Sequence, residues 1–344
     1  MQSNSYKPVI IWLYTGVVLI IMMVAVGGLV RLNNSGLSIV EWNPVTGIIP
    51  PLNQEEWQYA FDQYKKIPEF AKEHKHFDLN DFKVIYLWEY FHRLIARLIG
   101  FIFLIPFLIF WYKGYFKNKA LFRNVVLIFF FALFQAWLGW YMVTSGFTKL
   151  TDVSHYRLAV HLFVATLLGS FVLWTAHSLK FASYKSKYIP NFKKYTLLIL
   201  IVLIIQIFYG AFTAGLNAGY YYSDYPTMSG QWFPVLAKKA YLENGFMSFL
   251  NDPSMVHFIH RWFAIVVLTL IILYYYYFKN KVNTLLKKWL NLAILLIIIQ
   301  ISLGILTVLT HINITLAILH QVNAILLFMT FVSILFLSWK KKTS

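Results

Sequence analysis

The sequence predicts an all-α membrane protein with eight transmembrane helices, arranged as two tandem, pseudo-symmetric four-helix bundles. Three observations support this prediction: the apolar composition, the sorting of charge between loops, and an internal repeat. Of the 344 residues, 59% are hydrophobic and only 12% are charged, which is too little polar surface for a soluble fold of this length. Several runs reach the roughly 20 apolar residues that a membrane-spanning helix requires.

The apolar runs define the spans in order. The first run follows Lys7 and resembles a signal peptide with a cleavage site at Ala25-Val26-Gly27. At about 22 residues it is long for such a segment, and the repeat needs it as a helix, so we interpret it as a retained span. The expected spans cover residues 9–30, 84–110, 125–145, 156–179, 195–216, 254–278, 289–310 and 316–338.

Charge sorts the loops into two sets. The loops 111–124, 180–194 and 279–288, with both tails, contain 17 Lys and Arg residues and no Asp or Glu. All 13 acidic residues lie in the other loops or at the adjoining helix starts. Basic residues that flank spans are typical of cytoplasmic loops, so we expect both termini in the cytoplasm. The net charge of +17 therefore indicates topology in a lipid bilayer and not a nucleic-acid partner.

The chain contains no cysteine. This excludes disulfides, thiolate metal sites and iron–sulfur clusters. Any metal or cofactor must therefore be held by His, Met or carboxylate side chains.

An internal repeat divides the chain into an N-terminal domain, 1–180, and a C-terminal domain, 190–344. Because the motifs recur in the same order, they predict a four-helix unit that is used twice in parallel topology. The repeated motifs are His92-Arg93 with His260-Arg261, Gln135-x-x-x-Gly139 with Gln300-x-x-x-Gly304, and His161 with His320 after a Leu-Ala pair.

Four histidines occupy repeat-related positions, each expected one to two turns from the outer end of an inward-running span: His92, His161, His260 and His320. Neutral imidazole is a good iron ligand, and polar side chains within spans are rare unless functional. Two imidazoles that face each other across a bundle form a bis-histidine haem slot, so we expect one haem in each half. His257, one turn before His260, stays open as a rival ligand. The other histidines are interpreted as structural or, like His74 and His76, as solvated.

Glu89 lies three residues before His92, so both side chains project from one face of the helix. It is either an N-terminal helix acid or a group that moves a proton or stabilises positive charge beside the first haem. The equivalent position in the second half is His257, so the two sites are expected to differ chemically. Four arginines near this depth either bind haem propionates or snorkel to the interface: Arg93, Arg97, Arg157 and Arg261.

The segment from Gly27 to Gly47, followed by Pro50-Pro51-Leu52, resembles the first outer loop of haem A synthases of the mitochondrial and α-proteobacterial branch. Nearly the whole chain is similar to this family. The other matching motifs are Glu89-x-x-His92-Arg93-Leu-x-x-Arg97, Tyr156-Arg157-Leu-Ala-x-His161, Tyr225-Pro-x-Met-x-Gly230, Phe258-x-His260-Arg261 and Leu319-His320-Gln321.

The resemblance implies a reaction and its site. The C-terminal bundle would hold haem b through His260 and His320. The N-terminal bundle would bind the substrate haem O near His92 and His161, with Glu89 close to the reacting edge. The enzyme would be an oxidoreductase that converts a ring methyl of haem O to a formyl group, giving haem A for cytochrome oxidase assembly.

The resemblance also implies partners: the haem O synthase that supplies the substrate, an electron-transfer partner, and the lipid bilayer of a bacterial inner membrane or, alternatively, of the mitochondrial inner membrane. It leaves a homo-oligomer open.

The residues alone predict a two-haem membrane protein with an asymmetric first site, and a non-catalytic dihaem b-type electron carrier is the alternative function. Such carriers usually place two ligands on one helix, whereas each helix here supplies one.

Overall fold

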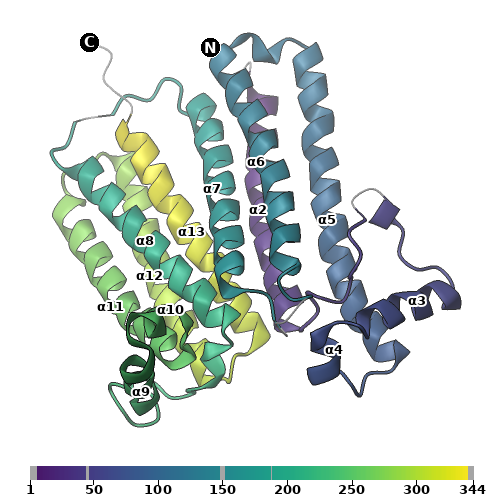
Figure 1. Ribbon diagram of the computed structural model, residues 1–344. Helices are drawn as coiled ribbons and strands as arrows, with labels where there is room; N and C mark the ends of the chain where they lie inside the picture. Colours follow the sequence, from purple (N-terminus) through teal and green to yellow (C-terminus); the bar gives the residue numbers. More distant parts are fainter. Residues whose placement is uncertain (1–5, 44–45, 148–151, 187, 340–344) are drawn as a thin grey trace. The chain divides into compact units, whose positions relative to one another are not determined.

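The computed structural model of the chain (Figure 1) describes residues 6–43, 46–147, 152–186 and 188–339. Within these ranges, eight helices are long and apolar enough to cross a membrane, which confirms the eight expected spans. Besides one isolated bridge between Met228 and Gln231, the described residues form helices, turns and loops. The chain is therefore an all-α integral membrane protein. The spanning helices are α2 Lys7–Leu32, α5 Leu79–Tyr112, α6 Lys119–Val143, α7 His155–Lys180, α8 Phe192–Gly215, α11 Pro253–Phe278, α12 Thr284–Leu309 and α13 Ile314–Trp339.

Polar caps outside the apolar runs fix where several spans begin. Asp78 accepts hydrogen bonds from the backbone N–H groups of Asn80 and Asp81 in a capping box, and a cap of this kind satisfies donors that the first helical turn leaves unpaired. Helix α5 therefore begins at Leu79 and not at residue 84. Asn118 and Asn283 cap α6 and α12 in the same way.

The early start of α5 changes the expected position of His92 along its helix. His161, His260 and His320 lie within about two turns of the first residues of α7, α11 and α13, as expected. His92 lies much further along its helix, because α5 begins at Leu79. The expectation that His92 lies one to two turns from the start of its helix was wrong.

Contacts between residues divide the chain into two compact units, Val18–Ala165 and Met1–Val17 with Thr166–Ser344. In the second unit, α8, α11, α12 and α13 form a closed ring in which each helix packs against two others, so these helices make a four-helix bundle. Helix α13 buries the largest share of its apolar window among the eight spans. The division of the chain into tandem halves, 1–180 and 190–344, stays a prediction.

Short helices lie in the two long loops that the charge pattern predicts on the outer side of the membrane. Helices α3 Gln54–Tyr64 and α4 Pro68–Lys72 precede α5, and α9 Val235–Asn244 and α10 Ser248–Asn251 pack against α11. Figure 1 shows each pair near the end of the long helix that follows it. The described ranges also contain four 3-10 turns: η1 Thr46–Ile48, η2 Tyr115–Lys117, η3 Ala218–Tyr220 and η4 Gly245–Met247.

The segment around α3 and α4 has its own apolar core, formed by Leu37, Phe61, Tyr64, Ile67, Phe82 and Ile85. The Tyr64 hydroxyl donates to Glu69 at 3.0 Å and hydrogen-bonds His74 Nδ1 at 2.5 Å. His74 also stacks on Phe77 and is only 7% exposed. The expectation that His74 is solvated was therefore wrong, whereas His76 is exposed.

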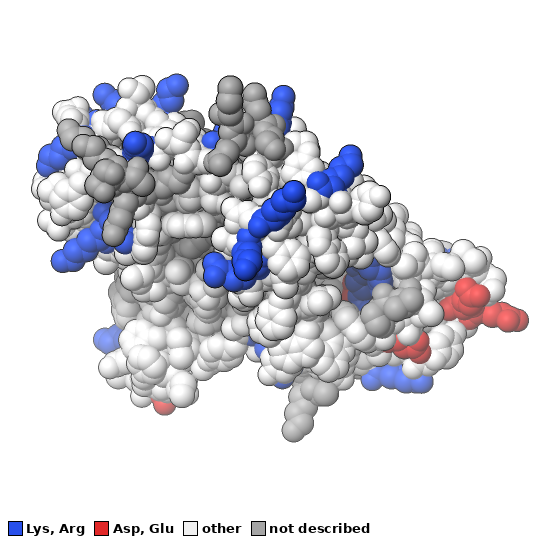
Figure 2. All heavy atoms as spheres, turned by 90° about the horizontal axis from the view of Figure 1, so that it is seen from above, with Lys and Arg blue, Asp and Glu red and all other residues white. Residues whose placement is uncertain are grey.

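Basic side chains are prominent in one view of the surface. In Figure 2, Lys and Arg side chains are prominent and Asp and Glu side chains are few. The described helix ends and adjoining loops carry basic residues such as Lys113, Lys193 and Lys279. Lys187 and Lys340–Lys342, which belong to the same basic set, lie outside the described residues.

The buried carboxyl group of Glu69 predicts a pH-dependent stability of the outer segment. Burial raises the pKa of Glu69 from 4.5 to about 8, against the opposing effect of the Tyr64 hydrogen bond. The folded state then holds this proton more tightly than the unfolded state, so stability falls as pH rises from about 4.5 through 8. Glu69→Gln cannot ionise, and its unfolding temperature in detergent should fall less than that of the wild type between pH 5.5 and 8.5.

The matched control for this measurement is Glu55→Gln, which changes an exposed carboxylate of α3. It should follow the wild-type pH profile. Identical profiles for Glu69→Gln and the wild type would contradict the role of burial.

Candidate functional site

His260 and His320 face each other within the C-terminal helix ring. Their ring centroids are 6.4 Å apart and the ring planes are nearly perpendicular, at 83°. An imidazole nitrogen binds a transition metal at about 2 Å, so two rings on opposite sides of one metal have centres about 6 Å apart. The pair therefore has the spacing of two axial ligands.

The rival ligand His257 is engaged elsewhere. It is 2% exposed, and its Nε2 accepts a hydrogen bond of 3.0 Å from Arg261 Nε. The geometry of the facing pair thus favours His260 over His257 as the candidate ligand.

Each of the four candidate ligands lies against a glycine of the preceding spanning helix. At each glycine, an added Cβ would come into contact with the imidazole, most closely at Gly304. The rings therefore pack on helix backbone, which only glycine exposes at this distance. The nearest distances from such a Cβ are 3.4 Å from Gly27 to His92 Nε2, 3.2 Å from Gly139 to His161 Cε1, 3.2 Å from Gly210 to His260 Cε1 and 2.9 Å from Gly304 to His320 Cε1.

Sequence reasoning recognised Gln135-x-x-x-Gly139 and Gln300-x-x-x-Gly304 only as markers of the repeat, and it missed Gln206 and Gly210. The same spacing, Gln206-x-x-x-Gly210, stands in α8 and could have been found by aligning every odd-numbered span. In the structure, Gln206 Nε2 lies 3.1 Å from His260 Nδ1.

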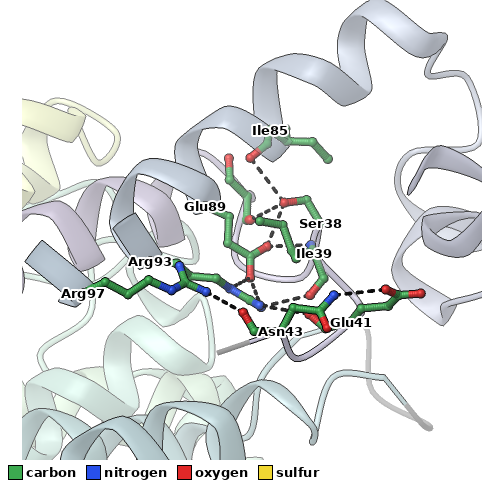
Figure 3. A network of polar contacts seen from close by, with 9 residues as sticks. Ser38, Ile39, Glu41, Asn43, Ile85, Glu89, Arg93 and Arg97 are labelled. Carbon is green, nitrogen blue, oxygen red and sulfur yellow. Dashed lines mark hydrogen bonds and ion pairs between the residues drawn. The ribbon is translucent and has the colours of Figure 1, made fainter. Parts of the chain in front are cut away.

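Glu89 is held in a network of donors (Figure 3). The side chain is 3% exposed. Its Oε2 accepts hydrogen bonds from Ser38 Oγ at 2.7 Å and from the backbone N–H of Ile39 at 2.8 Å. Its Oε1 accepts from Arg93 Nη2 at 2.6 Å and from Arg93 Nε at 3.1 Å. Charge-assisted bonds of this kind are the strong ones, so the carboxylate is fixed in position.

The same arginine anchors the first outer loop. Arg93 donates to the backbone carbonyls of Ile39 at 2.9 Å and Glu41 at 3.3 Å, and Arg97 donates to the carbonyl of Asn43 at 2.8 Å. Figure 3 shows both guanidinium groups turned toward this loop. The loop, α3 and α5 line an open pocket of ≈ 570 Å³ whose lining includes Arg93 and Arg97.

The second outer loop is anchored in a similar way. Arg261 donates to the backbone carbonyls of Tyr222, Asp224 and Thr227 at 2.8 to 3.1 Å. Burial opposes ionisation of Asp224, but hydrogen bonds from Ser229, Thr227 and Gly230 outweigh it and lower the pKa of Asp224 to about 2.

The fourth candidate arginine, Arg157, donates to the carbonyl of Tyr141 at 2.6 Å. All four arginines therefore bind protein carbonyls, and their binding of propionates stays a prediction.

The sequence predicts the candidate metal ligands in pairs. In the part of the chain that the structure describes, no three His, Asp or Glu side chains converge as a metal site. A pair of imidazoles suits a metal whose remaining ligands come from a macrocycle.

His177 has a structural role that agrees with its assignment from sequence. Its Nδ1 hydrogen-bonds Tyr14 Oη at 2.8 Å and its Nε2 hydrogen-bonds Ser333 Oγ at 2.9 Å. Both ring nitrogens are thereby occupied, so this buried side chain holds three helices together.

Eight apolar helices, paired imidazoles on helix backbone and a fixed buried carboxylate define a polytopic membrane protein whose helices can hold a metal-centred group. The chain belongs to the cytochrome oxidase assembly protein family, whose sequence profile matches residues 10–332.

Three relatives named "Heme A synthase" are similar over nearly their whole length. The protein of Flavobacterium psychrophilum is 40% identical over 340 residues, which cover 96% of this chain and 97% of the relative. The protein of Pelagibacter ubique is 40% identical over 338 residues, covering 97% and 98%. That of Wolbachia pipientis is 39% identical over 354 residues, covering 99% and 97%. These similarities confirm the family resemblance found in the sequence.

The Glu89–Arg93 pair should be a large contributor to stability. Arg93→Gln leaves a buried carboxylate without its charged partner, which typically lowers the free energy of unfolding by about 3–5 kcal/mol. Chemical unfolding in detergent micelles measures this loss. The control is Lys65→Gln, which breaks an ion pair with Asp62 whose side chains are 38% and 52% exposed, and it should cost about 1 kcal/mol or less. Equal losses in the two variants would contradict the role of the buried pair.

Proposed function

We propose that the protein is a haem A synthase, which oxidises a ring methyl of haem O to a formyl group and so makes haem A for cytochrome oxidase. The observation that carries the proposal is the pair His260 and His320, whose rings stand 6.4 Å apart as axial ligands would. The repeat-related His92 and His161 provide a second set of imidazoles in the other half. The names and full-length similarity of the relatives support the same reaction.

The C-terminal bundle is proposed to hold haem b. His260 and His320 would be the axial ligands, since their spacing fits a porphyrin iron between them. Gly210 and Gly304 let the two helix backbones approach the rings. When bound, this haem supplies a redox group that can accept and release single electrons.

The N-terminal site is proposed to bind haem O as substrate through His92 and His161. Removing electrons from the macrocycle builds positive charge, and a preorganised negative group lowers the cost of that charge. Glu89 is such a group, because Arg93, Ser38 and Ile39 hold it in place without solvent. Of the two roles considered for Glu89, this fixed geometry favours a stationary charge over a proton carrier.

The two halves differ at this position. The second half has His257 at the position of Glu89, so this position carries an imidazole and not a carboxylate. His257 accepts a hydrogen bond from Arg261. We therefore assign the reaction to the first half and electron storage to the second. The four arginines at the outer ends of these sites are the proposed partners of the haem propionates.

The surroundings of the protein follow from charge and chemistry. The basic helix ends favour a topology with both termini in the cytoplasm, and the bacterial relatives favour a bacterial inner membrane as its location. Haem O comes from a haem O synthase, and the oxidation requires an electron-transfer partner. A homo-oligomer is compatible with these roles.

A variant series tests the haem b site. His260→Ala or His320→Ala should abolish the bis-histidine optical spectrum of the stably bound haem, because each variant removes one axial ligand. His257→Ala should retain the spectrum and serves as the control on the same helix. The opposite pattern, with haem lost from His257→Ala and kept by His260→Ala, would transfer the ligand role to His257.

Glu89→Gln tests the reaction. The variant keeps an acceptor for Ser38 and Ile39 but removes the charge, so the haem b spectrum should persist while conversion of haem O falls by about 10²–10³-fold. Pigment extraction after expression beside a haem O producer measures haem A. Glu69→Gln, which neutralises another buried carboxyl group, should convert haem O normally. Full conversion by Glu89→Gln would refute the assigned role, and a wild type that binds haem but converts none would be an electron carrier.

A further inference from the structure

Three of the four candidate ligands have a glutamine carboxamide at their edge. The Nε2 atoms of Gln135, Gln206 and Gln300 lie 3.1, 3.1 and 3.2 Å from Nδ1 of the histidine that each contacts. Those of Gln135 and Gln300 also lie 3.3 and 3.2 Å from Nε2 of the same rings. Each glutamine stands one helical turn before the glycine that packs on the same ring. An amide within a membrane span is costly unless it has a partner, so its repetition at three sites indicates a specific task.

The task follows from the chemistry of a metal-bound imidazole. A histidine that binds iron through Nε2 keeps a proton on Nδ1, and an acceptor for this proton fixes the ring and raises its basicity. For His320, the backbone carbonyl of Gln300 lies 3.1 Å from Nδ1. For His161 and His260, the side-chain oxygens of Gln135 and Gln206 are buried and lack a hydrogen-bond partner among the described residues. Their amide nitrogens donate to the backbone carbonyls of His161 and His260 at 3.0 Å. A half-turn of the terminal amide exchanges its nitrogen and oxygen, so it would give up this bond and present the oxygen to the proton on Nδ1. The side-chain oxygen of Gln300 already accepts from Asn323 Nδ2 at 2.7 Å, so Gln300 would act through its backbone carbonyl.

The fourth site departs from this pattern. Met23 occupies the position one turn before Gly27 in α2, and a thioether is only a weak acceptor. The His92 ring also differs in orientation. Gly27 faces its Nε2 and Cδ2 atoms, whereas the other three glycines face Cε1 of their histidines. The ring without a glutamine is therefore the one that is turned differently.

We propose that Gln135, Gln206 and Gln300 are positioning residues that strengthen one axial haem ligand each, and that Met23 leaves His92 the weakest ligand of the four. This inference rests on the proposed function. In the haem b site, a glutamine then strengthens each of the two ligands, as a permanently bound cofactor needs. The substrate site has support only on His161, and this weaker binding suits a haem that must enter as haem O and leave as haem A.

The reduction potential of haem b tests the first part of the proposal. Gln206→Met keeps both histidines, so the full-length protein should retain its bis-histidine spectrum. Its midpoint potential should rise, because a less basic ligand stabilises ferric iron less, and its haem affinity should fall by about 10–100-fold. Ile205→Met is the control, since it introduces the same side chain on the exposed face of α8 and should leave the potential unchanged.

The outcomes separate this proposal from the function on which it rests. A bis-histidine spectrum with an unchanged potential in Gln206→Met would overturn the positioning role and leave the haem site intact. A wild type without a bis-histidine spectrum would overturn the proposed function itself. If Gln206→Met does not accumulate, Gln206→Glu replaces it. A carboxylate is a stronger acceptor than an amide, so the midpoint potential of haem b should fall in Gln206→Glu. A rise in this potential would contradict the proposal.

Met23→Gln tests the second part. The new amide should support His92 and slow the loss of bound haem O to an excess of a haem-scavenging apoprotein, while the haem b potential stays constant. Met22→Gln, which places the amide on an exposed position of the same helix, is the matched control. An equal rate of haem O loss in Met23→Gln and the wild type would show that His92 is not limited by the missing acceptor.

Discussion

The bilayer imposes one constraint from which the main features of the site follow: a polar side chain within a span must find its partner inside the protein. Imidazoles, amides and a carboxylate all occur in these apolar helices, and their closest contacts are with one another or with arginine, although the side-chain oxygens of Gln135 and Gln206 have no partner among the described residues. Gln206 contacts His260, Arg93 holds Glu89, and Arg261 donates to His257. Since partners must be close and correctly directed, the constraint also fixes where the helices approach one another, and glycine supplies the room. The same residues therefore carry the polar groups of the site and determine where the helices pack together.

The internal repeat provides a scaffold on which small differences create distinct chemistry. Both halves carry a histidine and an arginine at corresponding positions of α5 and α11, and both arginines bind an outer loop. The residue one turn before the arginine differs, with Glu89 in one half and His257 in the other. Under the proposed function, this difference would give two haems of similar ligation different electrostatic surroundings. It would then separate a reacting site from an electron store.

The sequence predicted the parts of the structure that depend on pattern. Apolar run length identified all eight spans, and the repeat identified His260 and His320, whose rings indeed face each other. Three features could not be predicted from the sequence, each for a separate physical reason. The capping box at Asp78 moved the start of α5 into polar sequence, where hydropathy gives no signal. The burial of His74 depends on Tyr64 and Phe77, which the chain brings together only on folding. The carbonyls that bind Arg93 and Arg261 belong to the backbone, which every residue shares and no motif marks.

That last contact has a consequence for how the outer loops can change. Arg261 binds the loop after α8 through the main-chain oxygens of Tyr222, Asp224 and Thr227. Because every residue has a main-chain oxygen, these contacts do not depend on most of the loop's side chains. Loop composition is free to drift, whereas an insertion or deletion that shifts those oxygens would release the loop. The loop after α8 should therefore tolerate many substitutions but few changes in its length.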